Sequence, residues 1–269
     1  MGGWTGPWLD QLAAREANKT AIGSGSESSA SPNKVLRNCH KLSLKTRNVG
    51  ASAAAGGAQH QSTSSCVLPH LMPLAHTFTA LERLDLVGNS IDLLGAKQLA
   101  AFMERRGCRV SCVLLCRCHL SDAAAAIICG ALQHNSTVRT LNLARNTLKS
   151  KSLRAIGAAL ATNSTLRELL LPWNNVCGAG LADGLAVGLS LNRGSLRTLD
   201  LSFNLLGRTG ADGLNGVPAL AEALRLNKGL TAIDLTSCQL NPQEVRDRTG
   251  AARAAKTKAH PRKTPTTRT

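Results

Sequence analysis

Five residues between positions 108 and 119 are of the types that bind metal ions or carry redox chemistry. They are Cys108, Cys112, Cys116, Cys118 and His119. A zinc site requires such thiolates and imidazoles to converge on one point. No C-x-x-C pair occurs among them, and the repeat pattern of the chain turns Cys118 inward while Cys112 and Cys116 point to an open face. We therefore predict no metal site in this segment.

Motifs of known enzyme chemistry are missing from the sequence. There is no phosphate-binding loop, no H-E-x-x-H, no nucleophile elbow and no paired-carboxylate motif. We therefore predict no catalytic residues, no bound cofactor and no enzymatic activity.

A repeat organises the middle of the chain. Six segments superpose without gaps on the pattern L-x-x-L-x-L-x-x-N/C-x-L, at spacings of 29, 28, 28, 30 and 34 residues. They are 81–91, 110–120, 138–148, 166–176, 196–206 and 230–240. The N/C position, called the ladder position, holds Asn89, Cys118, Asn146, Asn174, Asn204 and Cys238. Six copies at nearly constant spacing indicate a repeat architecture.

The repeat predicts both strands and helices. The alternating L-x-L is typical of a short strand with one buried face. Between the motifs, leucine and isoleucine recur at helical spacing, as at 153, 156 and 160 and again at 181, 185 and 189. Stacked strand–helix units predict an α/β solenoid shaped like a horseshoe, with a parallel sheet inside and helices outside. At the two Asn-Ser-Thr turns, 135–137 and 163–165, we expect a left-handed asparagine between helix and strand rather than a glycosylation site.

The repeat unit resembles a known family. The stretches AIGAALATNSTLRELLLPWNNV and ALAEALRLNKGLTAIDLTSCQL are similar to ribonuclease-inhibitor-type leucine-rich repeats, as found in NOD-like receptors and Ran GTPase-activating proteins. The resemblance covers about residues 66–240 and implies a non-enzymatic protein–protein interaction module or scaffold. It also leaves open a GTPase-activating regulator of a small GTPase, although the Ran activator carries an acidic C-terminal stretch and this chain a basic one.

The ends of the chain differ from the repeat domain at 66–240. Residues 1–65 are predicted to be mostly flexible, with a segment at 36–49 that is either a degenerate repeat or a coincidence. Residues 241–269 carry eight Lys and Arg against two acids within a chain of net charge +16, and are predicted to be a disordered basic tail. Such a tail could anchor an adaptor to an acidic surface, such as the cytoskeleton or nucleic acid.

Cysteine usage and hydropathy bear on location. The chain has nine cysteines, no recognisable secretory signal and no apolar run long enough to span a membrane. We expect a cytoplasmic protein, with the cytoskeleton or the nucleus as alternatives.

Candidate partner-binding residues follow from the repeat frame. The position just before the ladder residue, called the rim position, holds Gly88, Arg117, Arg145, Trp173, Phe203 and Ser237. Trp and Arg dominate protein-binding hot spots, so we predict that Arg117, Arg145, Trp173 and Phe203 form a protein-binding edge. Glu168, Asp200 and Asp234 face the concave surface and are added to this set. The alternative is that Trp173 folds back over its own loop as a plug.

Overall fold

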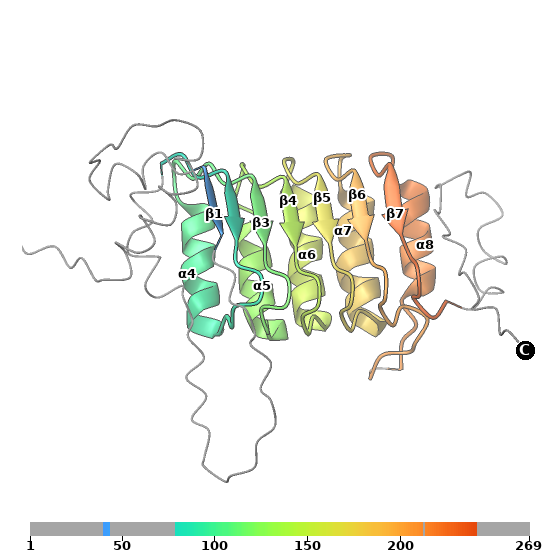
Figure 1. The fold of residues 1–269 in the computed structure, drawn as a ribbon. Coiled ribbons are helices and arrows are strands. Elements are labelled where there is room, and N and C mark those ends of the chain that lie inside the picture. The colour runs from blue at the N-terminus through green and yellow to red at the C-terminus, as the bar shows by residue number, and fades with distance from the viewer. Residues whose placement is uncertain (1–39, 44–78, 212, 241–269) are drawn as a thin grey trace, which may run out of the picture.

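The described part of the chain forms one parallel sheet covered by helices. The structure is a computed structural model that describes residues 40–43, 79–211 and 213–240. The strands are β1 (Lys41–Ser43), β2 (Arg83–Asp85), β3 (Cys112–Leu114), β4 (Thr140–Asn142), β5 (Glu168–Leu170), β6 (Thr198–Asp200) and β7 (Ala232–Asp234). They follow one another in chain order within a seven-stranded parallel sheet, and the helices line one face of it (Figure 1). The predicted α/β solenoid with an inner parallel sheet is confirmed.

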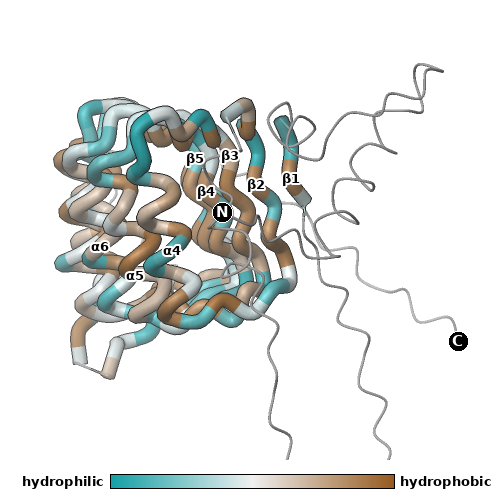
Figure 2. The backbone as a smooth tube through the Cα atoms, turned by 90° about the vertical axis from the view of Figure 1, so that its left-hand side faces the viewer, coloured by the Kyte–Doolittle hydropathy of each residue, from teal (hydrophilic) through white to brown (hydrophobic). Residues whose placement is uncertain are grey.

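The helices alternate with the strands. They are α4 (Leu93–Glu104), α5 (Asp122–Ala131), α6 (Ser150–Thr162), the π-helix η3 (Gly180–Ala186), α7 (Val187–Leu191) and α8 (Val217–Leu226). Figure 2 shows α4, α5 and α6 as one layer and the strands as the other, with hydrophobic segments in both. Because each layer carries an apolar face, the core lies between them.

The strands are held in register by a column of apolar side chains. Leu84 pairs with Val113, which pairs with Leu141, and the column continues through Leu169 and Leu199. All five side chains are buried. A shift of one residue would turn each of them to the open face, so the leucine pattern specifies the register.

Helix η3 differs from the predicted regular α-helix. Leucines 181, 185 and 189 are buried as predicted, but the hydrogen bonding is π-helical from Gly180 to Ala186. A spacing of four residues fits either helical period, so the leucine pattern does not separate them. Gly184 lies against α6 so closely that a Cβ atom there would be 2.7 Å from the backbone N of Arg154.

The turns at 135–137 and 163–165 are built differently from our prediction. Asn163 has φ −73° and ψ 126°, so it is extended, and the prediction of a left-handed asparagine is wrong. Its side-chain amide donates to Leu132 O at 2.7 Å and to Asn135 O at 2.8 Å, while Oδ1 accepts from Thr165 N at 2.9 Å and from Leu166 N at 2.8 Å. The asparagine is needed here for its side-chain hydrogen bonds rather than for its backbone freedom.

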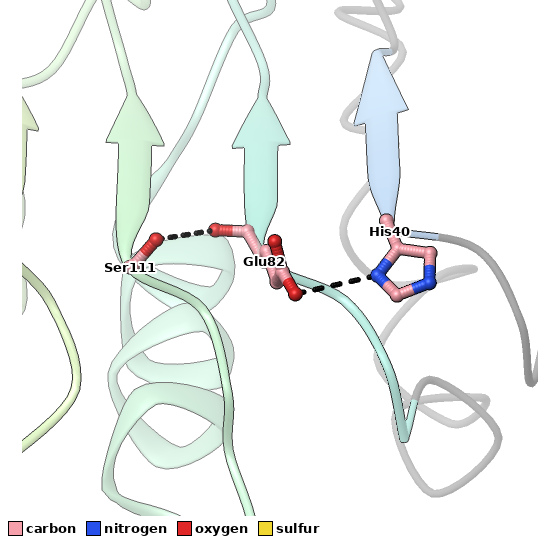
Figure 3. Close-up of polar contacts among 3 residues, drawn as sticks. All are labelled: His40, Glu82 and Ser111. Atoms are coloured by element: carbon pink, nitrogen blue, oxygen red, sulfur yellow. Dashed lines mark hydrogen bonds and ion pairs between the residues drawn. The ribbon is translucent and has the colours of Figure 1, made fainter.

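The first strand lies within the segment 36–49. Lys41–Ser43 pairs in parallel with β2, and Leu42 is fully buried. His40 O accepts from Glu82 N and Arg83 N, at 2.9 and 3.0 Å. His40 Nδ1 lies 3.3 Å from Glu82 Oε1, and Ser111 Oγ donates to Glu82 O at 3.2 Å. These contacts link the residues that immediately precede β1, β2 and β3 (Figure 3). The predicted flexible region and basic tail lie otherwise outside the described residues.

Candidate partner-binding rim

Asparagines at the ladder position tie each turn to its neighbours. Asn174 Nδ2 donates to Leu171 O of its own repeat at 3.0 Å and to Leu143 O of the preceding repeat at 3.1 Å. Its Oδ1 accepts from Asn146 N at 3.2 Å and Leu148 N at 3.3 Å, also in the preceding repeat. Asn146 and Asn204 repeat this arrangement. The turns therefore lie at fixed positions along one edge of the sheet.

The rim position has one backbone conformation throughout. Its φ angle is positive in every repeat, at 80° for Gly88, 53° for Arg117, 57° for Arg145, 58° for Trp173, 56° for Phe203 and 57° for Ser237. This left-handed region is strained for residues other than glycine, at about 1–2 kcal/mol each. The left-handed turn directs each side chain outward while the next residue, the ladder residue, turns inward.

Three rim side chains form a continuous stack. The rings of Trp173 and Phe203 lie 4.3 Å apart between centroids and 8° from parallel. The guanidinium carbon of Arg145 lies 4.5 Å from the centroid of the Trp173 ring. Trp173 is 47% exposed and Phe203 40% exposed. We call Arg145, Trp173 and Phe203 the aromatic stack.

Arg117 precedes the stack by one repeat. Its side chain is exposed at the rim position, and the ring contacts of the described residues do not include it. The structure thus brings together three of the four predicted rim residues. It leaves the fourth beside them in the same row.

The concave carboxylates are placed on the open face of the sheet. Glu168 Oε2 accepts from Thr140 Oγ1 at 3.0 Å and is exposed. Asp200 Oδ1 accepts from Ser202 N at 2.9 Å, and Asp234 Oδ1 accepts from Thr236 N at 2.9 Å. The two aspartates therefore close the turn after their strands, a structural role that the repeat frame did not indicate.

The cysteine-rich segment is divided between the interior and the open face. Cys118 is buried and its Sγ donates to the backbone O of Leu86 at 3.1 Å, so the thiol takes the place of a ladder asparagine. Burial raises the pKa of Cys118 to about 12. Cys112 Sγ lies 3.3 Å from Nη1 of Arg83, and burial raises its pKa as well. Within ranges 40–43, 79–211 and 213–240, no three His, Cys, Asp or Glu side chains gather where they could hold a metal ion.

The stack and the strain were not predicted from the sequence. The one signal for a left-handed rim position is Gly88, because glycine commonly occupies positions of positive φ. A single glycine among six residues does not establish a shared conformation, and stacking depends on side-chain rotamers that the repeat spacing leaves open.

Comparison with known proteins agrees with this architecture. The sequence model of the family described as Leucine Rich repeat matches residues 134–157 and 195–214. The chain therefore contains leucine-rich repeats. It is similar to human NACHT, LRR and PYD domains-containing protein 12, with 31% identity over 165 residues, covering 59% of this chain and 15% of that protein. It is also similar to mouse ribonuclease inhibitor, with 32% identity over 132 residues, covering 49% of this chain and 28% of the inhibitor.

The leucine-rich-repeat chain aligns with limited parts of these proteins. A third relative, mouse NACHT, LRR and PYD domains-containing protein 9B, is 33% identical over 175 residues, covering 64% of this chain and 16% of that protein. The chain thus spans less than a third of the length of each of the three relatives. The predicted resemblance to ribonuclease-inhibitor-type leucine-rich repeats is confirmed. Among the described helices, none has both the length and the apolar character needed to cross a bilayer.

Proposed function

We propose that this leucine-rich-repeat chain is a non-enzymatic interaction module that binds another protein through the aromatic stack on its rim. The observation that carries the proposal is the exposed, cross-repeat stack of Arg145, Trp173 and Phe203. We further propose a cytoplasmic location and a single repeat domain at 66–240, with Arg117 and the concave carboxylates as additional contacts.

The geometry of the stack suits a binding surface. Trp173 leans on the next repeat through Phe203 and lies under Arg145 of the preceding repeat, so its orientation is set before a partner arrives. Less side-chain entropy is then lost on binding. Trp and Arg are the residue types enriched at the centres of interfaces.

The alternative of a loop plug fits the contacts less well. A plug would cover its own loop, whereas the Trp173 ring stacks sideways on the neighbouring repeat and keeps 47% of its surface exposed. The left-handed conformation recurs at every rim position and directs both rings outward from the sheet edge.

A relative's name is consistent with action by binding. Mouse ribonuclease inhibitor is named for blocking an enzyme, which requires contact with another protein and no chemistry of its own. We infer the same mode of action for this chain, without carrying over the partner.

The test compares two pairs of exposed apolar side chains in a pull-down from a cell lysate. One variant is Trp173→Asn/Phe203→Asn, which removes the rings and suits the left-handed backbone. The matched control is Leu93→Asn/Leu94→Asn on α4, where the leucines are 46% and 56% exposed. Circular dichroism checks that both variants fold.

We expect a protein that binds wild type to be lost in the rim variant and kept in the control. The proposal is wrong if the rim variant retains every partner of the wild-type protein. A loss shared equally by the two variants would also contradict it, because the rim would then have no special part.

A further inference from the structure

The turns that lead from helix to strand change character along the solenoid. Two earlier turns read Asn-Ser-Thr, at 135–137 and 163–165, whereas two later turns read Asn-Arg-Gly-Ser and Asn-Lys-Gly, at 192–195 and 227–229. In the earlier turns the threonine hydroxyl donates to the backbone of the preceding repeat, as from Thr137 to Val110 O at 3.0 Å. In the later turns a cation and a glycine replace the Ser-Thr pair.

The two later turns pack against each other through glycine. Gly194 has φ +89°, and a Cβ atom on Gly229 would come within 2.8 Å of the Gly194 carbonyl carbon. An open hollow of about 390 Å³ lies beside the two turns. It is lined by Asn192, Arg193, Gly194, Arg197, Leu226, Lys228 and Gly229. We call it the basic hollow, because three of its seven lining residues are cations and none is an acid.

The cations of the basic hollow are available to a ligand. Arg197 Nη1 donates to Gly229 O at 2.9 Å, which holds the guanidinium at the hollow and leaves further N–H donors. Arg193 and Lys228 are exposed. In the described part of the chain, none of the three cations pairs with a carboxylate. The positive charge at this site therefore has no ion-pair partner among residues 40–43, 79–211 and 213–240.

The wall of the basic hollow is rigid. Asn192 donates to Leu160 O at 2.8 Å and to Ser195 Oγ at 2.9 Å, and it accepts from Gly194 N and Leu196 N, both at 3.2 Å. Arg167 Nη1 donates to Ser195 O at 2.7 Å from the preceding repeat. The turn is thus held by its own hydrogen bonds and by the preceding repeat before any ligand binds.

We propose that the basic hollow is a binding site for a phosphorylated ligand, such as a soluble inositol phosphate or the same group on a lipid. Phosphate oxygens accept charge-assisted hydrogen bonds from guanidinium and ammonium groups, and glycine lets a ligand approach the backbone closely. The site lies at the strand ends opposite the aromatic stack, so it is independent of the protein-binding rim.

A single-stranded nucleic acid fits this edge less well. Such ligands are held by aromatic side chains that stack on the bases. Within the described residues, the exposed aromatic side chains are Trp173 and Phe203, and both lie on the other edge of the sheet. The chemistry of the hollow therefore favours isolated phosphate groups over bases.

The experiment measures binding of inositol hexakisphosphate to the full chain by isothermal titration calorimetry. The test variant, Arg193→Ser/Lys228→Ser, gives both turns the residue that stands at positions 136 and 164 of the earlier turns. The matched control, Arg105→Ser/Arg106→Ser, removes the same charge from the exposed turn after α4. A second arm uses phosphatidylcholine vesicles with and without phosphatidylinositol bisphosphate.

We expect the test variant to bind inositol hexakisphosphate about tenfold more weakly than wild type or worse, and the control to stay within about twofold. Loss of vesicle binding in the same variant would identify the lipid headgroup as a source of the phosphate. Vesicle binding that is absent in wild type would identify the soluble compound. Equal weakening of inositol hexakisphosphate binding in both variants would show that only the net charge of the protein matters, and would overturn the proposal. Undiminished binding by the test variant, or no binding by wild type, would overturn it as well.

Discussion

Replacement of Asn174 by alanine removes the side chain that joins two repeats at the middle of the ladder. The backbone N–H groups of Asn146 and Leu148 lose their acceptor, which lies at 3.2 and 3.3 Å in the structure. The carbonyls of Leu143 and Leu171 each lose a donor. These groups are buried inside the turn, so water molecules do not supply the missing hydrogen bonds.

The cost follows from the two orphaned donors. A buried polar group left without a partner costs about 1–3 kcal/mol, so two such N–H groups lower the free energy of unfolding by about 4 kcal/mol. This is a large fraction of the stability of a typical domain, which is about 5–15 kcal/mol.

Cysteine at the same position separates the donor from the acceptor. In the native chain Cys118 and Cys238 occupy the ladder position, and each thiol donates to the carbonyl of the preceding repeat, at 3.1 and 3.0 Å. Asn174→Cys should therefore keep the hydrogen bond to Leu143 O. It should lose most of the interaction with the N–H groups of Asn146 and Leu148, since sulfur is a weak acceptor. We expect Asn174→Cys to be about 1 kcal/mol more stable than Asn174→Ala, the net value of the retained hydrogen bond, and less stable than wild type because both N–H groups still lack a good acceptor.

The assay is urea unfolding of the three proteins followed by circular dichroism. The expected order of midpoints is wild type, Asn174→Cys, Asn174→Ala. An alanine variant as stable as wild type would show that the ladder bonds are dispensable. A cysteine variant as unstable as the alanine variant would refute the division of the asparagine's role between donor and acceptor.

Three further predictions concern other parts of the solenoid. Gly184→Ala should lower the free energy of unfolding by about 3 kcal/mol, because the added Cβ would press on the α6 backbone. Gly130→Ala should raise it by about 0.5–1 kcal/mol, because the added Cβ in α5 would meet open space. Thermal unfolding of the two variants and wild type tests both expectations. Burial alone would raise the pKa of Asp122, but hydrogen bonds from the Ser152 hydroxyl and from three backbone N–H groups at the start of α6 outweigh it and lower the pKa. The stability that this carboxylate contributes is present above its unfolded pKa of about 3.9 and is lost as pH falls through the lower folded value, so Asp122→Asn should flatten the acid end of a stability–pH curve. Burial, with a smaller contribution from the nearby charge of Asp122, raises the pKa of Cys129 to about 12, so iodoacetamide should leave this thiol unmodified in the folded protein and label it after denaturation, as mass spectrometry would show.

The repeat spacing was sufficient to predict the strands and the inward leucines. Leu141 and Leu169 are buried in register because a period of two residues within a strand leaves no other way to bury them. The order of the residues along the rim could also be predicted, since the same position of each motif lies at the same place on the sheet. Stacking at 4.3 Å between Trp173 and Phe203 was not, because it depends on rotamers.

The basic hollow escaped the sequence for a different reason. Arg193 and Lys228 lie one repeat apart in the chain and meet only because the repeats stack. In the linear sequence these two cations are separated by many residues within a region that is only mildly basic. In the fold, residues at the same position of successive repeats lie side by side. The π-helical turn at Gly180–Ala186 was equally hidden, since leucines four residues apart satisfy two helical periods.

The common backbone conformation of the rim has a consequence for how such surfaces change. The same left-handed turn accommodates glycine, arginine, tryptophan, phenylalanine and serine in this one chain, and the ladder residue beside it remains inward in each repeat. Because the ladder hydrogen bonds involve the backbone and the ladder side chain, the rim side chain can be exchanged without altering them. The rim is therefore a natural place for variation: a library of substitutions at Arg117, Arg145, Trp173, Phe203 and Ser237 would sample new binding specificities on an unchanged scaffold.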